Sequence, residues 1–472
     1  MSWVARIILA AAAAFLFARS QPPRMNGMEA CLGLTTLLIS LRGLSPRFAF
    51  WLGTGAGSLL SGLSIPWMLK IFPGATPYAI FVLCGLFFGL FAAVNARISP
   101  RIGSVWLRIF WIAAWWVAVE FYRSEWFILR FSWITPGVAG GPTYLTPFIG
   151  VYGQSFLIVF AAALMTEYFF RKESPARKTF SRFGSLAIVL AVILSLAALD
   201  SFRPPPVEPR DPVRVAAVQF EDGDFDAQMT LTRAATNSPQ LVIWPETAVF
   251  GDVRREYRRQ FAKLREHAKA SNVIVTVGCR TTFGTGERDW FNTALTFDGS
   301  GDLGEHHKNR PVHLFNDGIR GATAAAVKTP LGKIGTPICF DCDYTEICRR
   351  MARDGAEIFA VPSRDPSPWG DLQRVQHAQL LRLRAAECGR WFAIASAAGI
   401  TQIIDPNGNV RASLPPYRPA VLCGTIGRER ARTFYIACGW LLPWILSAIA
   451  VIGGIAAAFF PMIGNSRPAK FQ

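Results

Sequence analysis

The feature that most limits how this chain can fold is its series of long apolar runs. Seven runs, separated by short polar or Pro/Gly-containing turns, precede residue 201, and an eighth lies near the end. They span residues 3–19, 27–42, 46–69, 76–96, 104–122, 144–169, 184–200 and 434–462. Each approaches the roughly 20 residues that a helix needs to cross a bilayer, although 27–42 is short and could be re-entrant. A soluble protein could not cover so many apolar segments. We therefore predict a multi-helix membrane bundle with about eight transmembrane helices.

The basic residues test this arrangement, because alternate loops lie on opposite sides of the membrane and cytoplasmic loops are enriched in Lys and Arg. With the N-terminus in the cytoplasm, the cytoplasmic segments carry Arg6, Arg42, Arg47, Arg97, Arg101, Arg108, Arg171, Lys172, Arg177, Lys178, Arg182, Arg467 and Lys470. The opposite short loops carry only Arg19, Arg24, Lys70, Arg123 and Arg130. The polar domain between the last two runs is thus predicted to be extracytoplasmic. The first run also resembles a signal peptide, whose cleavage would leave that domain on the same side.

Charge and cysteine content argue against two other classes of protein. The formal net charge is +17, but the excess lies mainly in the apolar part, where it indicates membrane topology and anionic lipid contact rather than nucleic-acid binding. The nine cysteines show no paired spacing typical of a disulfide framework. Cys339, Cys342 and Cys348 are close together, but the histidines do not recur beside them at ligand spacing, so no metal site is expected.

A second domain begins after a proline-rich linker. The N-terminal transmembrane region covers 1–200, the linker 201–212, the polar domain 213–430 and the last transmembrane helix 434–462. Short β-rich runs in the polar domain are Val213–Phe220, Leu241–Trp244, Val273–Gly278, Thr293–Phe297, Lys333–Cys339, Ile358–Val361, Trp391–Ser396, Ile400–Ile404 and Val410–Ser413. Helical stretches lie near 226–236, 253–271, 344–354 and 372–388. This alternation predicts a layered α/β domain.

Three residues of the polar domain could carry chemistry. Glu246 follows an apolar strand and a proline, a rigid position for a general base, although an isolated carboxylate is usually a surface residue. Lys308 lies in a polar loop and, taken alone, is predicted to be a solvent-exposed lysine. Cys339 comes directly before an expected helix, whose N-terminus would favour the nucleophilic thiolate, and the N–H of Phe340 could bind an oxyanion. A buried structural cysteine is the alternative.

The order of these segments resembles the nitrilase (carbon–nitrogen hydrolase) superfamily with its Glu–Lys–Cys triad. The strand Val213–Gln219 opens the match, and the block from Arg384 to Phe392, followed by Gly399–Gly408, is more specific than any single triad residue. The resemblance covers about residues 213–428. It implies an αββα sandwich with Glu246, Lys308 and Cys339 at one edge of the sheets.

The arrangement of apolar runs around this domain resembles the apolipoprotein N-acyltransferase family. Phe131–Ile134 and Gly150–Phe156 are similar to family segments around the sixth helix. The resemblance implies an enzyme of the bacterial inner membrane with a periplasmic catalytic domain and no cofactor. It would transfer an acyl chain from a membrane phospholipid, through a thioester on Cys339, to the N-terminal amine of a diacylglyceryl-cysteine apolipoprotein. The alternatives are a membrane-tethered amidase or another acyltransferase with the same triad, and a non-catalytic transporter or assembly scaffold.

Three segments depart from the family pattern. The family has a second glutamate eight residues after the triad lysine; here position 316 is Asn and the nearest carboxylate is Asp317. Asp341 replaces the usual glutamate two residues after the nucleophile. The family's Asn-Asp-x-Trp-Phe segment is represented by residues 363–370, which include Trp369. We expect Asp317, Asp341, Trp369 and Phe340 to bind substrate or support the triad.

Overall fold

The computed structural model describes residues 1–170, 203–286 and 289–459. The chain forms two compact units. The first contains Met1–Thr143, Ile149–Arg203 and Trp440–Gln472, and the second contains Tyr144–Phe148 and Pro204–Gly439. Each unit is described by itself.

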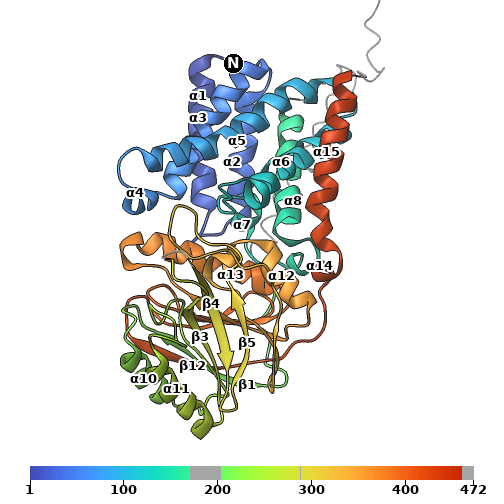
Figure 1. Ribbon diagram of the computed structural model, residues 1–472. Helices are drawn as coiled ribbons and strands as arrows, with labels where there is room; N and C mark the ends of the chain where they lie inside the picture. Colours follow the sequence, from blue (N-terminus) through green and yellow to red (C-terminus); the bar gives the residue numbers. More distant parts are fainter. Residues whose placement is uncertain (171–202, 287–288, 460–472) are drawn as a thin grey trace, which may run out of the picture. The chain divides into compact units, whose positions relative to one another are not determined.

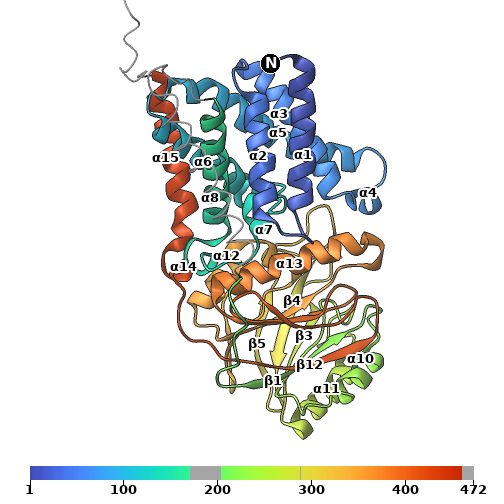
Figure 2. The same ribbon diagram turned by 180° about the vertical axis from the view of Figure 1, so that it is seen from behind.

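The first unit is built from apolar helices. Its helices are α1 (Trp3–Ser20), α2 (Gly27–Leu41), α3 (Pro46–Ser64), α4 (Met68–Ile71), α5 (Thr76–Ile98), α6 (Val105–Phe121), α7 (Pro136–Gly140), α8 (Thr146–Phe169) and α15 (Leu442–Phe459). Figures 1 and 2 show α1, α2 and α3 side by side. Glycines allow α3 and α5 to approach closely: a Cβ at Gly85 would lie 2.6 Å from the carbonyl oxygen of Thr54. Small residues at such a contact are typical of helix packing in membranes.

Five helices of the described residues are long and apolar enough to cross a membrane. They are Trp3–Ser20, Thr76–Arg101, Val105–Trp126, Thr146–Phe169 and Gly439–Phe459. The expected run 27–42 forms a shorter apolar helix, and 46–69 forms α3, which is not among the five. The run 184–200 lies outside the described residues. The chain is therefore a membrane protein, and the number of crossings beyond these five stays a prediction.

The second unit contains two six-stranded sheets. The first has the order β12-β1-β2-β3-β4-β5 and the second the order β11-β10-β9-β8-β7-β6. The strands of the first sheet are β1 (Val213–Gln219), β2 (Leu241–Ile243), β3 (Ile274–Thr282), β4 (Trp290–Phe297), β5 (Asp302–His307) and β12 (Ala420–Ile426). Those of the second are β6 (Val327–Thr329), β7 (Gly332–Gly335), β8 (Ile358–Ser363), β9 (Trp391–Ser396), β10 (Gln402–Ile404) and β11 (Val410–Ser413). The central strands β1–β3 and β7–β9 are parallel, so their carboxyl ends meet at common edges.

Side chains alternate between the two faces of the first sheet. Val215 and Ala217 belong to the apolar cluster between the sheets, which includes Trp391 of the second sheet. Ala216 and Val218 point the other way, into the outer cluster with residues of the helices α10 (Phe225–Arg233) and α11 (Arg258–Ser271). This period of two is that of a strand buried on both faces.

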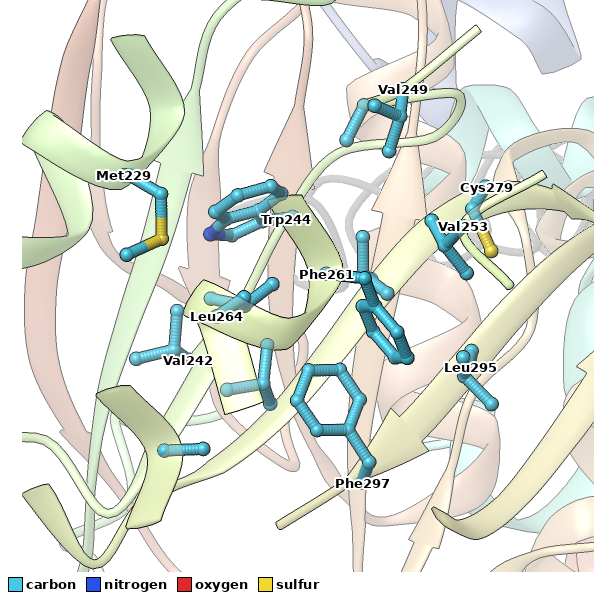
Figure 3. Close-up of a cluster of buried hydrophobic side chains, with 14 of the residues drawn as sticks. Met229, Val242, Trp244, Val249, Val253, Phe261, Leu264, Cys279, Leu295 and Phe297 are labelled. Atoms are coloured by element: carbon cyan, nitrogen blue, oxygen red, sulfur yellow. The ribbon is translucent and has the colours of Figure 1, made fainter. Parts of the chain in front are cut away.

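The outer cluster is a dense aromatic layer. Figure 3 shows Trp244, Phe261 and Phe297 among its aliphatic neighbours, and the rings of Phe261 and Phe297 lie 4.9 Å apart. The helices that cover the second sheet are α12 (Thr345–Arg353) and α13 (Asp371–Cys388) (Figure 1). The short helix α14 (Phe434–Ala437) is the last helix of this unit along the chain. The expected αββα sandwich is thus confirmed.

One predicted strand is wrong in its length. The sequence favoured a strand over Lys333–Cys339, but β7 ends at Gly335. Pro337 cannot donate a ladder hydrogen bond, and Cys339 has a φ of 46°, outside the extended region. The chain therefore turns before the cysteine, which changes how the thiol is presented.

Candidate active site

Cys339 begins a tight turn at the carboxyl end of β7. It is the first residue of the 3-10 turn η4 (Cys339–Asp343), and its side chain is buried. A positive φ is uncommon for a residue with a Cβ and is found mostly where the surrounding structure enforces it. The first bond within this turn runs from the N–H of Asp341 to the carbonyl oxygen of Ile338, at 2.8 Å. The N–H groups of Cys339 and Phe340 precede that bond and have no acceptor within the turn.

Asp341 ties the cysteine turn to the segment that carries Lys308. Its Oδ2 accepts a hydrogen bond from the N–H of Ile338 at 3.1 Å and lies 2.9 Å from His306 Nε2. Its Oδ1 accepts a hydrogen bond from the N–H of Arg310 at 2.7 Å. The carboxylate is fully buried. Asp341 therefore contacts the chain on both sides of Lys308.

Glu246 and Lys308 meet directly, although 62 positions separate them in the sequence. The Nζ of Lys308, which follows β5, lies 2.6 Å from Oε1 of Glu246, which lies just beyond β2. Both side chains are buried. The thiol of Cys339 is close enough to both groups to affect their pKa values. The three residues singled out from the sequence are thus brought to one place.

Gly278 allows the Glu246 segment to lie against β3. A Cβ at position 278 would be 2.3 Å from the carbonyl oxygen of Pro245 and 2.6 Å from the Cα of Glu246. The same segment is held by the N–H of Ala248, which donates to the carbonyl oxygen of Gly278 at 2.8 Å. Main-chain contacts therefore fix Glu246 on a rigid strand end.

Asp317 is the second carboxylate at Lys308. Its Oδ2 lies 2.7 Å from Lys308 Nζ and accepts a hydrogen bond from the N–H of Val312 at 2.9 Å. Asn316, which occupies the position of the family's glutamate, is exposed. The carboxylate next along the chain, and not position 316, therefore reaches the lysine.

Asn292 of β4 completes this cluster, and the sequence analysis missed it. Its Nδ2 donates to Oε1 of Glu246 at 2.7 Å and to Oδ1 of Asp317 at 2.8 Å. Its main-chain oxygen accepts a hydrogen bond from the N–H of Lys308 at 2.8 Å. The available signal was a fully buried amide within an otherwise apolar and Thr-containing strand, which needs a partner.

Burial and the close charges set the protonation states. Burial raises the pKa of Glu246; Lys308 lowers it and Asp317 raises it further. Burial lowers the pKa of Lys308, but Asp317 and Glu246 outweigh it, and the pKa lies well above its ordinary value. Burial, together with Glu246, also raises the pKa of Cys339 well above that of a free thiol. These shifts favour a neutral thiol at Cys339 and a charged ammonium at Lys308.

The expected thiolate at a helix N-terminus is not what the structure shows. Cys339 begins a 3-10 turn of five residues, not an α-helix, and α12 starts only at Thr345. A short turn contributes little dipole, and burial dominates the pKa of the thiol. Attack by Cys339 thus requires a base to remove its proton at the moment of reaction.

Phe340 and Trp369 lie in different surroundings. The ring of Phe340 packs edge-on against Tyr344, with centroids 5.2 Å apart, and 6.3 Å from the ring of His313. Trp369 is half-buried and its ring lies 5.5 Å from that of Phe315. Phe340 therefore adjoins Cys339 through the main chain, whereas Trp369 contacts Phe315 in the loop that precedes Asp317.

A buried histidine links the two segments that flank the thiol. His377 of α13 places Nδ1 2.8 Å from Oδ1 of Asp365 and Nε2 3.3 Å from Oδ1 of Asp343, the last residue of η4. Burial lowers the pKa of His377, but the two carboxylates raise it well above the ordinary value. The pKa of Asp365 is lowered, since His377 outweighs the effect of its burial. This cluster joins the turn of Cys339 to the loop after β8, and the sequence analysis did not find it.

The described residues hold no group of three or more His, Cys, Asp or Glu side chains suited to a metal ion. Cys342 and Cys348 place their sulfur atoms 3.9 Å apart, and all nine cysteines are free thiols.

Known proteins resemble the chain in both units. Residues 214–435 match the family model of carbon–nitrogen hydrolases, and residues 13–164 match that of the apolipoprotein N-acyltransferase N-terminal domain. An apolipoprotein N-acyltransferase of Pseudomonas putida is 28% identical over 514 residues, which cover 95% of this chain and 99% of that protein. One of Geobacter metallireducens is 25% identical over 500 residues, 95% of either chain. The crystal structure of the C. elegans NitFhit protein covers 50% of this chain and 65% of its own, with a TM-score of 0.41 and 21% identity.

Proposed function

The chain belongs to the family of the apolipoprotein N-acyltransferases, and from this premise we propose that it transfers an acyl chain from a membrane phospholipid to the N-terminal amine of diacylated lipoproteins. The relatives match over the membrane helices as well as the catalytic domain. The observation that carries the chemistry is the buried contact of 2.6 Å between Lys308 and Glu246, beside a buried Cys339 thiol whose pKa both groups affect.

The first half of the reaction would form a thioester on Cys339. Glu246 takes the thiol proton as Sγ attacks the ester carbonyl of the phospholipid. The ammonium of Lys308 and the N–H of Phe340 stabilise the developing oxyanion. When the carbon–oxygen bond breaks, Glu246 returns the proton to the leaving alkoxide. The products are a lysophospholipid and the acylated cysteine.

The second half would regenerate the thiol. The neutral amine of the lipoprotein attacks the thioester carbonyl, and the same oxyanion donors act again. Glu246 accepts a proton from the attacking nitrogen and gives it to the departing Cys339 sulfur. Water would hydrolyse the thioester, so the burial of the three side chains favours transfer over hydrolysis.

The membrane setting suits both substrates. The catalytic domain is preceded and followed in the chain by apolar helices, of which α8 and α15 can each span a bilayer. Donor and acceptor are themselves held in the membrane by acyl chains. The distribution of Lys and Arg supports an enzyme of the bacterial inner membrane with this domain on the periplasmic side.

Full-length protein, a phospholipid with a labelled acyl chain and a diacylated lipopeptide test the proposal together. We expect triacylated peptide and a base-labile acyl adduct on Cys339, located by mass spectrometry. Cys339→Ser and Glu246→Gln should abolish both products, whereas Cys438→Ser, which changes an exposed cysteine of the same unit, should retain them.

Three other outcomes would contradict the proposal. Turnover of simple amides without triacylated peptide would favour the membrane-tethered amidase, over which the relatives favour the acyltransferase. Acyl transfer that persists in Cys339→Ala would show that Cys339 is not the nucleophile. An acyl group on Cys342 or Cys388 would show that another thiol is the nucleophile.

A further inference from the structure

Arg364 lies between the proposed base and the proposed nucleophile. It follows the last residue of β8, Ser363, whose carbonyl oxygen accepts a hydrogen bond from the N–H of Glu246 at 3.3 Å. The carbonyl oxygen of Arg364 itself lies 3.5 Å from the Sγ of Cys339. The main chain at this position thus borders the site on which the reacting ester must lie.

The guanidinium of Arg364 is held in place without a compensating charge. Its Nη1 donates to Oγ1 of Thr247, the residue after Glu246, at 3.2 Å. Its Cζ lies 5.2 Å from the ring centroid of Phe250. Nε is buried and has no hydrogen-bond partner, and no carboxylate of the described residues lies within 4.0 Å of the group. By contrast, the nearby Arg310 pairs with Glu346 at 2.6 Å.

A guanidinium without a neighbouring carboxylate can bind an anion. The side chain is partly exposed, so a ligand can reach it. A guanidinium presents a planar set of donors that matches phosphate, and stacking on an aromatic ring fixes its plane.

We propose that Arg364 binds the phosphodiester of the phospholipid donor while the donor's ester carbonyl lies at Cys339. This inference rests on the proposed function. In a glycerophospholipid only the glycerol carbons separate the reacting ester from the phosphate, so a cation one side chain away from the nucleophile is suitably placed. The acceptor offers an amine, which gains nothing from a nearby cation. Arg364 therefore serves the first half of the reaction and selects donors that carry phosphate.

The selectivity between two donors tests the proposal in full-length protein. Phosphatidylethanolamine and diacylglycerol offer the same esters, but only the first has a phosphate. We expect Arg364→Gln to lower the ratio of kcat/KM for thioester formation from the two donors about tenfold to a hundredfold, mainly through KM for the phospholipid. Arg364→Lys should retain part of the ratio, because it keeps the charge but loses the planar fork.

A matched control is Arg265→Gln on α11, which changes an arginine that also stacks on a phenylalanine, at 4.9 Å, and should leave the ratio unaltered. An unchanged ratio in an Arg364→Gln protein with the wild-type thermal midpoint, whether or not both donors lose activity equally, would overturn the inference. If the wild-type protein forms no thioester from either donor, the proposed function itself fails.

Discussion

The carboxylate of Asp317 lies 2.7 Å from the ammonium of Lys308, which a second carboxylate, Glu246, contacts at 2.6 Å. The charge of Lys308 is therefore shared between two carboxylates. Asp317 raises the pKa of both groups. It keeps Lys308 charged and makes Glu246 a better acceptor for the thiol proton.

Asp317→Asn should lower the rate of thioester formation about tenfold to a hundredfold, because it removes one of two charges that hold the Lys308 ammonium. Asp317→Glu should recover part of the rate. Adding the family's glutamate in Asn316→Glu/Asp317→Asn should not, since position 316 is exposed. Single-turnover acylation of Cys339 measures all three. Full recovery in the double variant would show that the loop can present either position.

Asn292 donates hydrogen bonds to the carboxylates of Glu246 and Asp317 and is expected to fix their positions. Asn292→Leu leaves Glu246 and Asp317 without their shared donor and should destabilise the protein by roughly 1–3 kcal/mol. Asn292→Asp adds a third buried carboxylate and should raise the pKa of Glu246 further. The thermal midpoint and the pH profile of thioester formation check the two effects. The acidic limb of the pH profile should move to higher pH in Asn292→Asp. An equal shift in Asn292→Leu would show that the added charge of the aspartate is not its cause.

The layers of the fold could be predicted because their cause is local. All four residues from Val215 to Val218 are apolar, as expected of a strand buried on both faces. Val215 and Ala217 lie in one apolar cluster of the first sheet, and Ala216 and Val218 lie in the other. Glu246 could be singled out because it follows an apolar strand, whose end can hold a side chain on a rigid support. Lys308 taken alone indicated only a solvated residue, and the resemblance to the nitrilase superfamily singled it out.

The positioning residues could not be predicted, since their partners are far away in the sequence. Asn292 is 46 residues from Glu246, and only the register of the folded sheet sets its side chain beside that carboxylate. His377 lies on a helix, where a buried histidine has no short-range pattern. The end of β7 was misplaced because a positive φ at Cys339 depends on tertiary contacts.

The His377 cluster makes stability depend on pH. His377 faces Asp343 from η4 and Asp365 from the loop after β8, with Gln373 and Arg374 on its own helix bonded to Asp365. Its folded pKa is raised. The stabilisation is therefore complete below the unfolded pKa of about 6.5 and is lost as pH rises through the higher folded value.

His377→Gln should thus lower the free energy of unfolding by about 3–5 kcal/mol near pH 6, since it leaves buried carboxylates without their cation. The difference from wild type should shrink as pH rises. Thermal midpoints of the full-length protein across this range measure it. His267→Gln is the control: burial lowers the pKa of His267, so its replacement should change the pH slope in the opposite sense. A difference for His377→Gln that is independent of pH would indicate lost packing rather than lost charge.

Gly278 sets the position of the proposed base through contacts with the main chain. The Cβ of Gly278→Ala would lie 2.3 Å from the carbonyl oxygen of Pro245 and 2.6 Å from the Cα of Glu246. Neither atom belongs to a flexible side chain, so the Glu246 segment itself must shift. A displacement of about 1 Å can lower a rate by about two orders of magnitude.

We expect Gly278→Ala to lower kcat for thioester formation about a hundredfold, because the segment that carries Glu246 is displaced. The thermal midpoint should fall as well, by the equivalent of about 1–3 kcal/mol. Gly55→Ala, whose Cβ would meet no atom within 4 Å, should leave the rate unchanged. A wild-type kcat in Gly278→Ala would mean that the Glu246 segment tolerates the shift and that its main-chain contacts do not fix the base.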